Sequence, residues 1–350
     1  MTPIPLHLPL RPSEAAEIAA LIFEHAERKP LTDELRNRLA ARAVALRLEG
    51  IVPYFGSLAR DPVHPSSYYL AVDGIETPHL LHLAFASAPT SSIFHKALLI
   101  GRTCRLNGPE FVINAIPFGP TDRESIDRFV ALVDTAFLPR PQGSRASLTI
   151  RSDYQRAFEF FGALHKRRGR NLAAVAGDYH ACVWAAIRTG WRQEYSVVAE
   201  IAVDHTNLVV RDTLAYTRFA IDVSTMPRGE AALKAAEYEH EEIRQARALL
   251  KAGSDFDFEI QMGNPNDEEV GFALAWLKER GHAPQFIGVG AAVSDAVAEV
   301  ARQHKVSLSF RYAGEPLPVI ESRVRATAGR LNYYVADPSE AEIVAEGLMI

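Results

Sequence analysis

Acidic and amide side chains alternate with apolar ones between Asp255 and Met262. Successive side chains of a strand point to opposite faces, so the polar set would share one face. A helical pattern follows, within a longer strand-then-helix rhythm in which both faces of a sheet are normally covered. Acids on a covered face are costly unless they bind something, so this segment predicts a polar active site. We expect Glu259 to be its acid–base residue and Gln261 to bind substrate.

The elements that would position these side chains recur regularly from Phe111 onward. Eight apolar or alternating segments predict strands, and helical patterns separate most of them. This rhythm favours an α/β fold, a (β/α)8 TIM barrel. The alternative is an open doubly wound sheet, although no glycine-rich dinucleotide fingerprint follows the first strand. The expected strands cover residues 111–116, 145–150, 171–176, 195–202, 217–222, 255–260, 284–289 and 306–311; the expected helices cover 122–137, 153–168, 179–189, 230–252, 266–280 and 293–304.

The chain divides by pattern into three parts. Residues 1–108 predict an N-terminal α+β lobe, residues 109–327 the barrel, and residues 328–350 a C-terminal segment packed on the barrel. Within the lobe, two helical patterns precede two strands at 68–72 and 79–84. The Asp73-Gly74 pair between these strands predicts a hairpin.

Composition limits the classes of function. The net charge of -5 provides no basic stripe, so we expect no nucleic-acid partner. The only cysteines, Cys104 and Cys182, exclude a disulfide framework and suit a reducing compartment. No segment approaches the length of a membrane span, so the sequence predicts a cytoplasmic protein without membrane contact. Whether the chain forms a homo-oligomer stays open.

Polar residues near the predicted strand ends are further candidates, because the C-terminal ends of barrel strands line the active site. Each has a simpler interpretation. Asp178 and Asp222 are catalytic candidates that also suit a helix cap and a turn cap, and His180 then becomes a surface or packing residue. Glu200 and Glu259 are harder to explain structurally, although a buried pair with Arg311 would do so. The full set is Asn114, Asp178, His180, Glu200, Asp204, His205, Asp222, Glu259, Gln261 and Arg311.

Carboxylates beside an imidazole suit a divalent metal ion, with Zn, Mn, Fe and Co all compatible. His205 with Asp204 or Glu200, plus Glu259, would provide such a site. Because side chains alternate, Asp204 and His205 can both point inward only if the strand has already ended. Arg311 suits a carboxylate or phosphate of the substrate, and Asn114 and His180 would add polar contacts.

Three segments resemble the tagaturonate epimerase family: Ala199–His205, Phe219–Ser224 and Phe256–Gln261. The resemblance implies a metal-dependent epimerase of a keto sugar acid. It also implies that His205 is a metal ligand and that Glu259 is a ligand or an acid–base residue. This chain departs from the family at Arg311, which stands where the family has a histidine and which cannot ligate a metal.

The sequence therefore predicts a carbohydrate-active barrel enzyme, an epimerase or isomerase acting on a keto sugar or sugar acid with metal assistance. Retro-aldol cleavage and re-addition is the simplest route to a C4 change in a 2-keto sugar. The alternative is a non-catalytic homologue that binds a sugar or a partner chain and has lost its metal site. We expect Glu259 and Gln261 to face the barrel interior near its mouth, and Arg311 either to pair with Glu259 or to flank a cavity with it.

Overall fold

The computed structural model describes the strand backbones between residues 52 and 117 and most of the chain from residue 137. In the second region it describes 137–143, 147–151, 157–158, 171–175, 177–189, 191, 194–203, 215–249, 255–290, 293–336 and 338–348. The chain divides into two compact units, Met1–Leu138 with Val183–Arg192, and Pro139–Cys182 with Gln193–Ile350.

The first unit contains a five-stranded antiparallel sheet in the order β1-β2-β3-β5-β4. The predicted hairpin is confirmed, because β2 and β3 pair from Ser66↔Ala84 to Val72↔Pro78. The two N-terminal helices predicted for the lobe lie outside the described residues, so the α+β assignment stays a prediction. The strands are β1 (Val52–Arg60), β2 (Ser66–Val72), β3 (Pro78–Phe85), β4 (Arg102–Arg105) and β5 (Glu110–Pro117).

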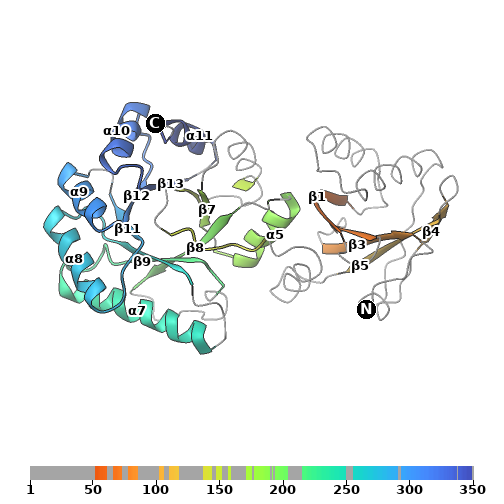
Figure 1. Ribbon diagram of the computed structural model, residues 1–350, viewed down its shortest axis with the longest axis horizontal. Helices are drawn as coiled ribbons and strands as arrows, with labels where there is room; N and C mark the ends of the chain where they lie inside the picture. Colours follow the sequence, from red (N-terminus) through yellow and green to blue (C-terminus); the bar gives the residue numbers. More distant parts are fainter. Residues whose placement is uncertain are drawn as a thin grey trace. The chain divides into compact units, whose positions relative to one another are not determined.

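The second unit is a closed barrel of eight parallel strands with helices outside it (Figure 1). The predicted TIM barrel is thus confirmed. Its strands are β6 (Ser147–Ile150), β7 (Asn171–Val175), β8 (Tyr195–Ala202), β9 (Arg218–Asp222), β10 (Asp257–Gln261), β11 (Phe286–Val289), β12 (Ser307–Arg311) and β13 (Leu331–Val335). The described helices are α5 (Tyr179–Thr189), α7 (Glu230–Leu249), α8 (Asp267–Glu279), α9 (Asp295–Gln303), α10 (Leu317–Ala326) and α11 (Pro338–Gly347).

The first strand of the barrel is β6, one strand later in the chain than predicted. The segment expected to be the first barrel strand is β5, which pairs antiparallel with β3 and β4. The eighth strand is instead β13, which closes the barrel against β6. The C-terminal segment 328–350 is therefore part of the barrel itself, and a barrel that starts at residue 109 is wrong.

Local signals mark the helices where the sequence predicts them. Asn266 caps α8 in a full capping box with Glu269, and Ser294 caps α9 through the backbone N–H of Val297. Gly281 has φ +81° just after α8, a conformation that glycine adopts without strain. None of the described helices is long and apolar enough to cross a membrane.

Candidate functional site

The alternation predicted for β10 separates its side chains as expected. Glu259 and Gln261 are buried inside the barrel, where the Glu259 carboxylate meets the Tyr334 hydroxyl of β13. Phe258, on the opposite face, stacks on His240 of α7 with ring centroids 4.4 Å apart. The predicted inward orientation of Glu259 and Gln261 is therefore confirmed.

Glu259 is fully enclosed by polar partners. Tyr334 Oη donates to its Oε2 at 2.8 Å, and Gln261 Nε2 donates to its Oε1 at 2.5 Å. Burial raises the pKa of Glu259, while the nearby charge of Arg218 and hydrogen bonds from Tyr334 and Ser309 act against that rise. Glu259 has no exposed surface, and its partners Tyr334 and Gln261 are only 3% and 7% exposed.

Arg218 of β9 is a central residue that the sequence analysis missed. Its side chain is fully buried, with Nη1 3.7 Å from Glu259 Oε2 and Cζ 3.8 Å from the ring centroid of Phe286. The predicted strand 217–222 contained the signal, because Arg218 shares a face with Asp222 two alternations later. Arg218 is the first residue of its strand, whereas the candidate residues were taken from the C-terminal strand ends.

Asp257 has a different role from Glu259 on the same strand. Its carboxylate accepts hydrogen bonds from the backbone N–H groups of Gln142, at 2.8 Å, and Gly143, at 3.0 Å. Burial raises the pKa of Asp257, against the charge of Arg218 and these two hydrogen bonds. Asp257 thus fixes the segment that leads into β6, at the N-terminal end of the barrel, away from the mouth.

Two arginines flank Tyr334 at the C-terminal mouth. Arg311 ends β12 and lies level with Tyr334 on the adjacent strand, while Arg151 follows β6 on its other side. Arg151 has its Cζ 5.4 Å from the Tyr334 ring centroid and forms an ion pair with Glu200 of β8. Burial lowers the pKa of Arg151, and the positive charge of Arg311 lowers it further. The two arginines therefore form a rim above a buried tyrosine–carboxylate pair, and the charges of Glu259 and Asp222 also act on Arg151.

Of the two arrangements expected for Arg311 and Glu259, the direct pair is not formed, and a cavity between them stays a prediction. No ion pair joins them, and Arg311 is only the last of the influences on the pKa of Glu259. Arg311 is exposed at the mouth, whereas Glu259 is enclosed below it. A ligand would therefore meet Arg311 at the mouth, whereas Glu259 lies deeper in the barrel.

Two other candidate acids make local caps. Asp178 accepts from the backbone N–H groups of His180, at 3.0 Å, and Ala181, at 3.1 Å, at the start of α5. Asp222 accepts from the backbone N–H of Ser224 at 2.9 Å. His180 Nδ1 lies 4.0 Å from Asp178. These contacts match the simpler interpretations, and catalytic or binding roles for these three residues stay predictions.

The remaining candidates do not join this group. Asn114 lies in β5, where its backbone pairs with His82 in the antiparallel sheet, so the reason for placing it at a barrel mouth is lost. Asp204 and His205 lie outside the described residues. Within the described part of the chain, no three histidine, cysteine or acidic side chains meet as a metal ligand set. Glu200 faces Arg151 instead, and two nearby guanidinium groups oppose a divalent cation.

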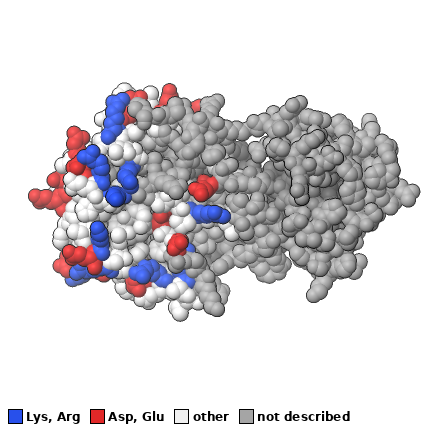
Figure 2. Space-filling model, viewed as in Figure 1, with Lys and Arg blue, Asp and Glu red and all other residues white. Residues whose placement is uncertain are grey.

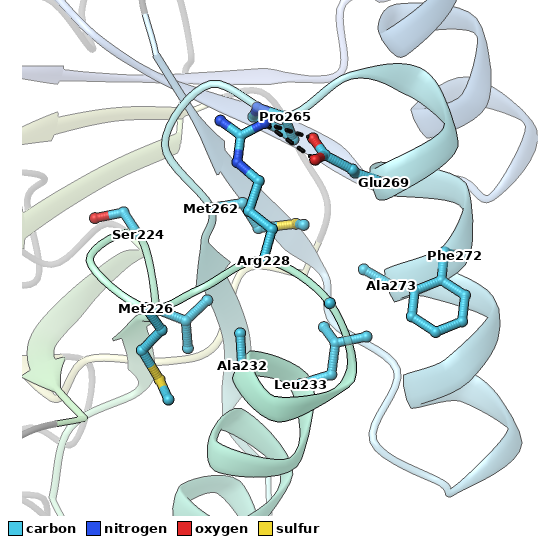
Figure 3. Close-up of a pocket in the computed structure, with 12 residues that line it drawn as sticks. Ser224, Met226, Arg228, Ala232, Leu233, Met262, Pro265, Glu269, Phe272 and Ala273 are labelled. Atoms are coloured by element: carbon cyan, nitrogen blue, oxygen red, sulfur yellow. Dashed lines mark hydrogen bonds and ion pairs between the residues drawn. The ribbon is translucent and has the colours of Figure 1, made fainter.

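A hollow beside the mouth lies between the starts of α7 and α8 (Figure 3). Its lining is mainly apolar and includes Met226, Met262 and Phe272. Its charged groups already bind each other, since Arg228 Nη1 donates to Glu269 Oε2 at 2.8 Å. Elsewhere on the face drawn in Figure 2, positive and negative side chains are interspersed among the described residues. The barrel mouth is therefore the stronger candidate site.

Solved structures of similar fold include the fructuronate-tagaturonate epimerase UxaE from Cohnella laeviribosi. The native form aligns with a TM-score of 0.54 and 14% identity, over 86% of this chain and 74% of that chain. A form with one bound glycerol gives a TM-score of 0.53 and 14% identity, over 87% and 74%. The sequence matches no family model and no curated protein. The resemblance expected from the sequence motifs is confirmed at the level of the fold.

Proposed function

We propose that this chain is a barrel enzyme that epimerises or isomerises a keto sugar or sugar acid. The observation that carries the proposal is the mouth itself, where Arg151 and Arg311 flank the Tyr334 ring above the buried Glu259 carboxylate. Guanidinium groups suit a substrate carboxylate, because their planar fork matches two oxygens. The fold shared with UxaE supports the same class of substrate.

In this proposal Tyr334, held in place by Glu259, is the hydrogen-bond donor to the substrate. Burial and the neighbouring Glu259 hold the pKa of Tyr334 well above its ordinary value, so its hydroxyl stays a donor at neutral pH. It can turn from the Glu259 carboxylate to donate a hydrogen bond to a substrate oxygen that gains negative charge, and turn back to Glu259 when that charge is lost. The same pair serves either an enediolate or a retro-aldol route.

The metal-assisted part of the proposal depends on Asp204 and His205. The described residues do not assemble a ligand set. A divalent ion held by those residues would polarise a substrate carbonyl. Adding Zn²⁺, Mn²⁺, Fe²⁺ or Co²⁺ to separate assays tests this part independently of the arginine rim.

The direct test is conversion of tagaturonate and fructuronate by the purified protein, followed by carbon-13 NMR with each metal added. Tyr334→Phe is expected to lower turnover by at least about a hundredfold, because the donor is lost. Tyr238→Phe, on the exposed face of α7, is the matched control and is expected to retain activity. Full activity in Tyr334→Phe would contradict the assigned mechanism.

A non-catalytic sugar- or partner-binding homologue is the second candidate. Its supporting observation is that Glu200, a predicted metal ligand, binds Arg151 instead. Saturable binding of sugar acids without conversion under any metal condition would favour this alternative over the enzyme.

A further inference from the structure

The two arginines of the rim differ in how they are neutralised. Arg151 is in contact with Glu200, and both side chains remain about one-third exposed, at 30% and 32%. Arg311 is also exposed, and no carboxylate of the described residues forms an ion pair with it. The rim therefore presents two guanidinium groups, and only that of Arg151 is paired with a carboxylate, that of Glu200.

Of these two guanidinium groups only Arg151 has an ion-paired carboxylate among the described residues, while Glu259 and Asp222 act on Arg151 from farther away. The two guanidinium groups are close enough that the charge of Arg311 contributes to lowering the pKa of Arg151. An anion that reached both groups would relieve this repulsion and gain charge-assisted hydrogen bonds. Glu200 reaches Arg151 from β8, on the opposite side of Arg151 from β13 and Arg311 in the strand order.

We infer that Glu200 occupies on Arg151 the place of a ligand carboxylate, and so acts as an internal competitor for the sugar acid that Arg151 and Arg311 bind together. The inference rests on the proposed function, whose substrate it deepens by assigning the carboxylate end to this rim. Tyr334 and Gln261, at the floor between the strands, would then meet the hydroxyl or carbonyl oxygens next to that carboxylate.

If Glu200 competes with the ligand, its removal has the opposite effect to the removal of an ordinary binding residue. Removing the charge of Glu200 should tighten binding, because Arg151 becomes available without breaking an ion pair. Glu200→Gln is expected to strengthen binding of glucuronate by about two- to fivefold, the range of a partly exposed ion pair. Arg151→Gln and Arg311→Gln are each expected to weaken it by at least about tenfold.

Isothermal titration of the full-length protein with glucuronate, glucose and inorganic phosphate tests the inference. Glucuronate is expected to bind more tightly than neutral glucose and more tightly than phosphate. Glu299→Gln, which removes an exposed ion pair of α9, is the matched control and should not change the affinity. Glu200→Ser is a second variant in case Glu200→Gln does not fold.

Several outcomes would overturn the inference. They are unchanged or weaker glucuronate binding in both Glu200 variants, equal binding of glucose, tighter binding of phosphate, and no binding of any probe at about 10 mM. Because titration requires no turnover, failure of the proposed function is distinguishable. Tightening in Glu200→Gln without conversion of any keto sugar acid would support the rim and reject the enzyme.

Discussion

Glu259 joins the stability of the barrel to its proposed chemistry. Its carboxylate is buried beside the Arg218 guanidinium, with 3.7 Å between Oε2 and Nη1. Glu259→Gln would remove one of the two buried carboxylates near Arg218, the other being Asp257, so we expect roughly 3 kcal/mol less stability as well as lost turnover. Urea unfolding measures the change, and Glu299→Gln, in an exposed pair, should shift the free energy by less than about 0.5 kcal/mol.

His240 makes the barrel sensitive to acid. It contacts His282 with 2.7 Å between the Nδ1 atoms, and burial, followed by the charges of His282 and Arg244, lowers its pKa from 6.5 to about 3. The unfolded chain therefore binds a proton between these pH values that the folded chain excludes. Stability should fall as the pH decreases from about 6.5, with a limiting slope of about 1.4 kcal/mol per pH unit.

A pH series of urea unfolding curves checks the role of His240. His240→Phe keeps an aromatic ring against Phe258 and should flatten the slope below pH 6.5. The exposed His304, at the end of α9, provides the control variant His304→Gln, which should leave the slope unchanged. An equal slope in the His240 variant would assign the acid sensitivity to another group.

Sequence reasoning found the orientation of Glu259 and Gln261 but missed their partners. Alternation is local, so it places a side chain on a face without naming what lies opposite. Tyr334 and Glu259 are 75 residues apart in the sequence, and the local pattern of neither segment predicts their contact. Arg151 was likewise missed, because it follows its strand and its importance comes from Arg311 and Glu200.

At the scale of elements, α8 depends on its N-cap. The Asn266 side chain accepts from the backbone N–H of Glu269 at 2.9 Å, and the Glu269 carboxylate accepts from the backbone N–H of Asn266 at 2.8 Å. Asn266→Ala removes one half of this box and should cost about 1 kcal/mol. Asn266→Ser keeps an acceptor oxygen and should be nearly neutral. Equal melting temperatures of the two variants would refute the assignment of Asn266 as the N-cap of α8.

Gly288, on the inner face of β11, leaves room for the side chain of Gln261 on β10. Gly288 pairs with Gln261 in the register, and a Cβ added at Gly288 would lie 2.1 Å from Gln261 Oε1. Gly288→Ala should therefore displace Gln261 from Glu259 and cost about 1–3 kcal/mol. Gly271→Ala, in α8, meets only Val300 at 3.7 Å and should instead stabilise the helix slightly. Unfolding free energies of both variants provide the comparison.

The sequence identified seven barrel strands and misplaced one. Helix caps and glycines are local signals, which explains the agreement at α8 and α9. The segment that became β5 has the apolar character of a barrel strand, and one strand does not reveal whether its neighbours run parallel. The true eighth strand, Leu331–Val335, follows α10, which begins at Leu317 with Pro316 as its N-cap and Pro318 in its first turn.

For the whole molecule, the end of the chain is expected to be indispensable. Deleting residues 328–350 removes β13 and α11, and with β13 it removes Tyr334 and the closure against β6. We expect this truncation to lose cooperative thermal unfolding, as followed by circular dichroism. A chain ending after Leu348 is the control and should unfold cooperatively. Normal cooperativity in the longer truncation would show that the barrel tolerates an open side.

The closure of β13 on β6 also governs when the protein can finish folding. Thr149 Oγ1 donates to Asn332 Oδ1 at 2.8 Å across 183 residues, so the first barrel strand waits for the last to be synthesised. Until then, the nascent chain exposes the unpaired edges of β6 and β12, which can pair with other chains. A chain emerging from the ribosome is therefore vulnerable to aggregation until β13 has been synthesised, and chaperone protection matters most over that interval.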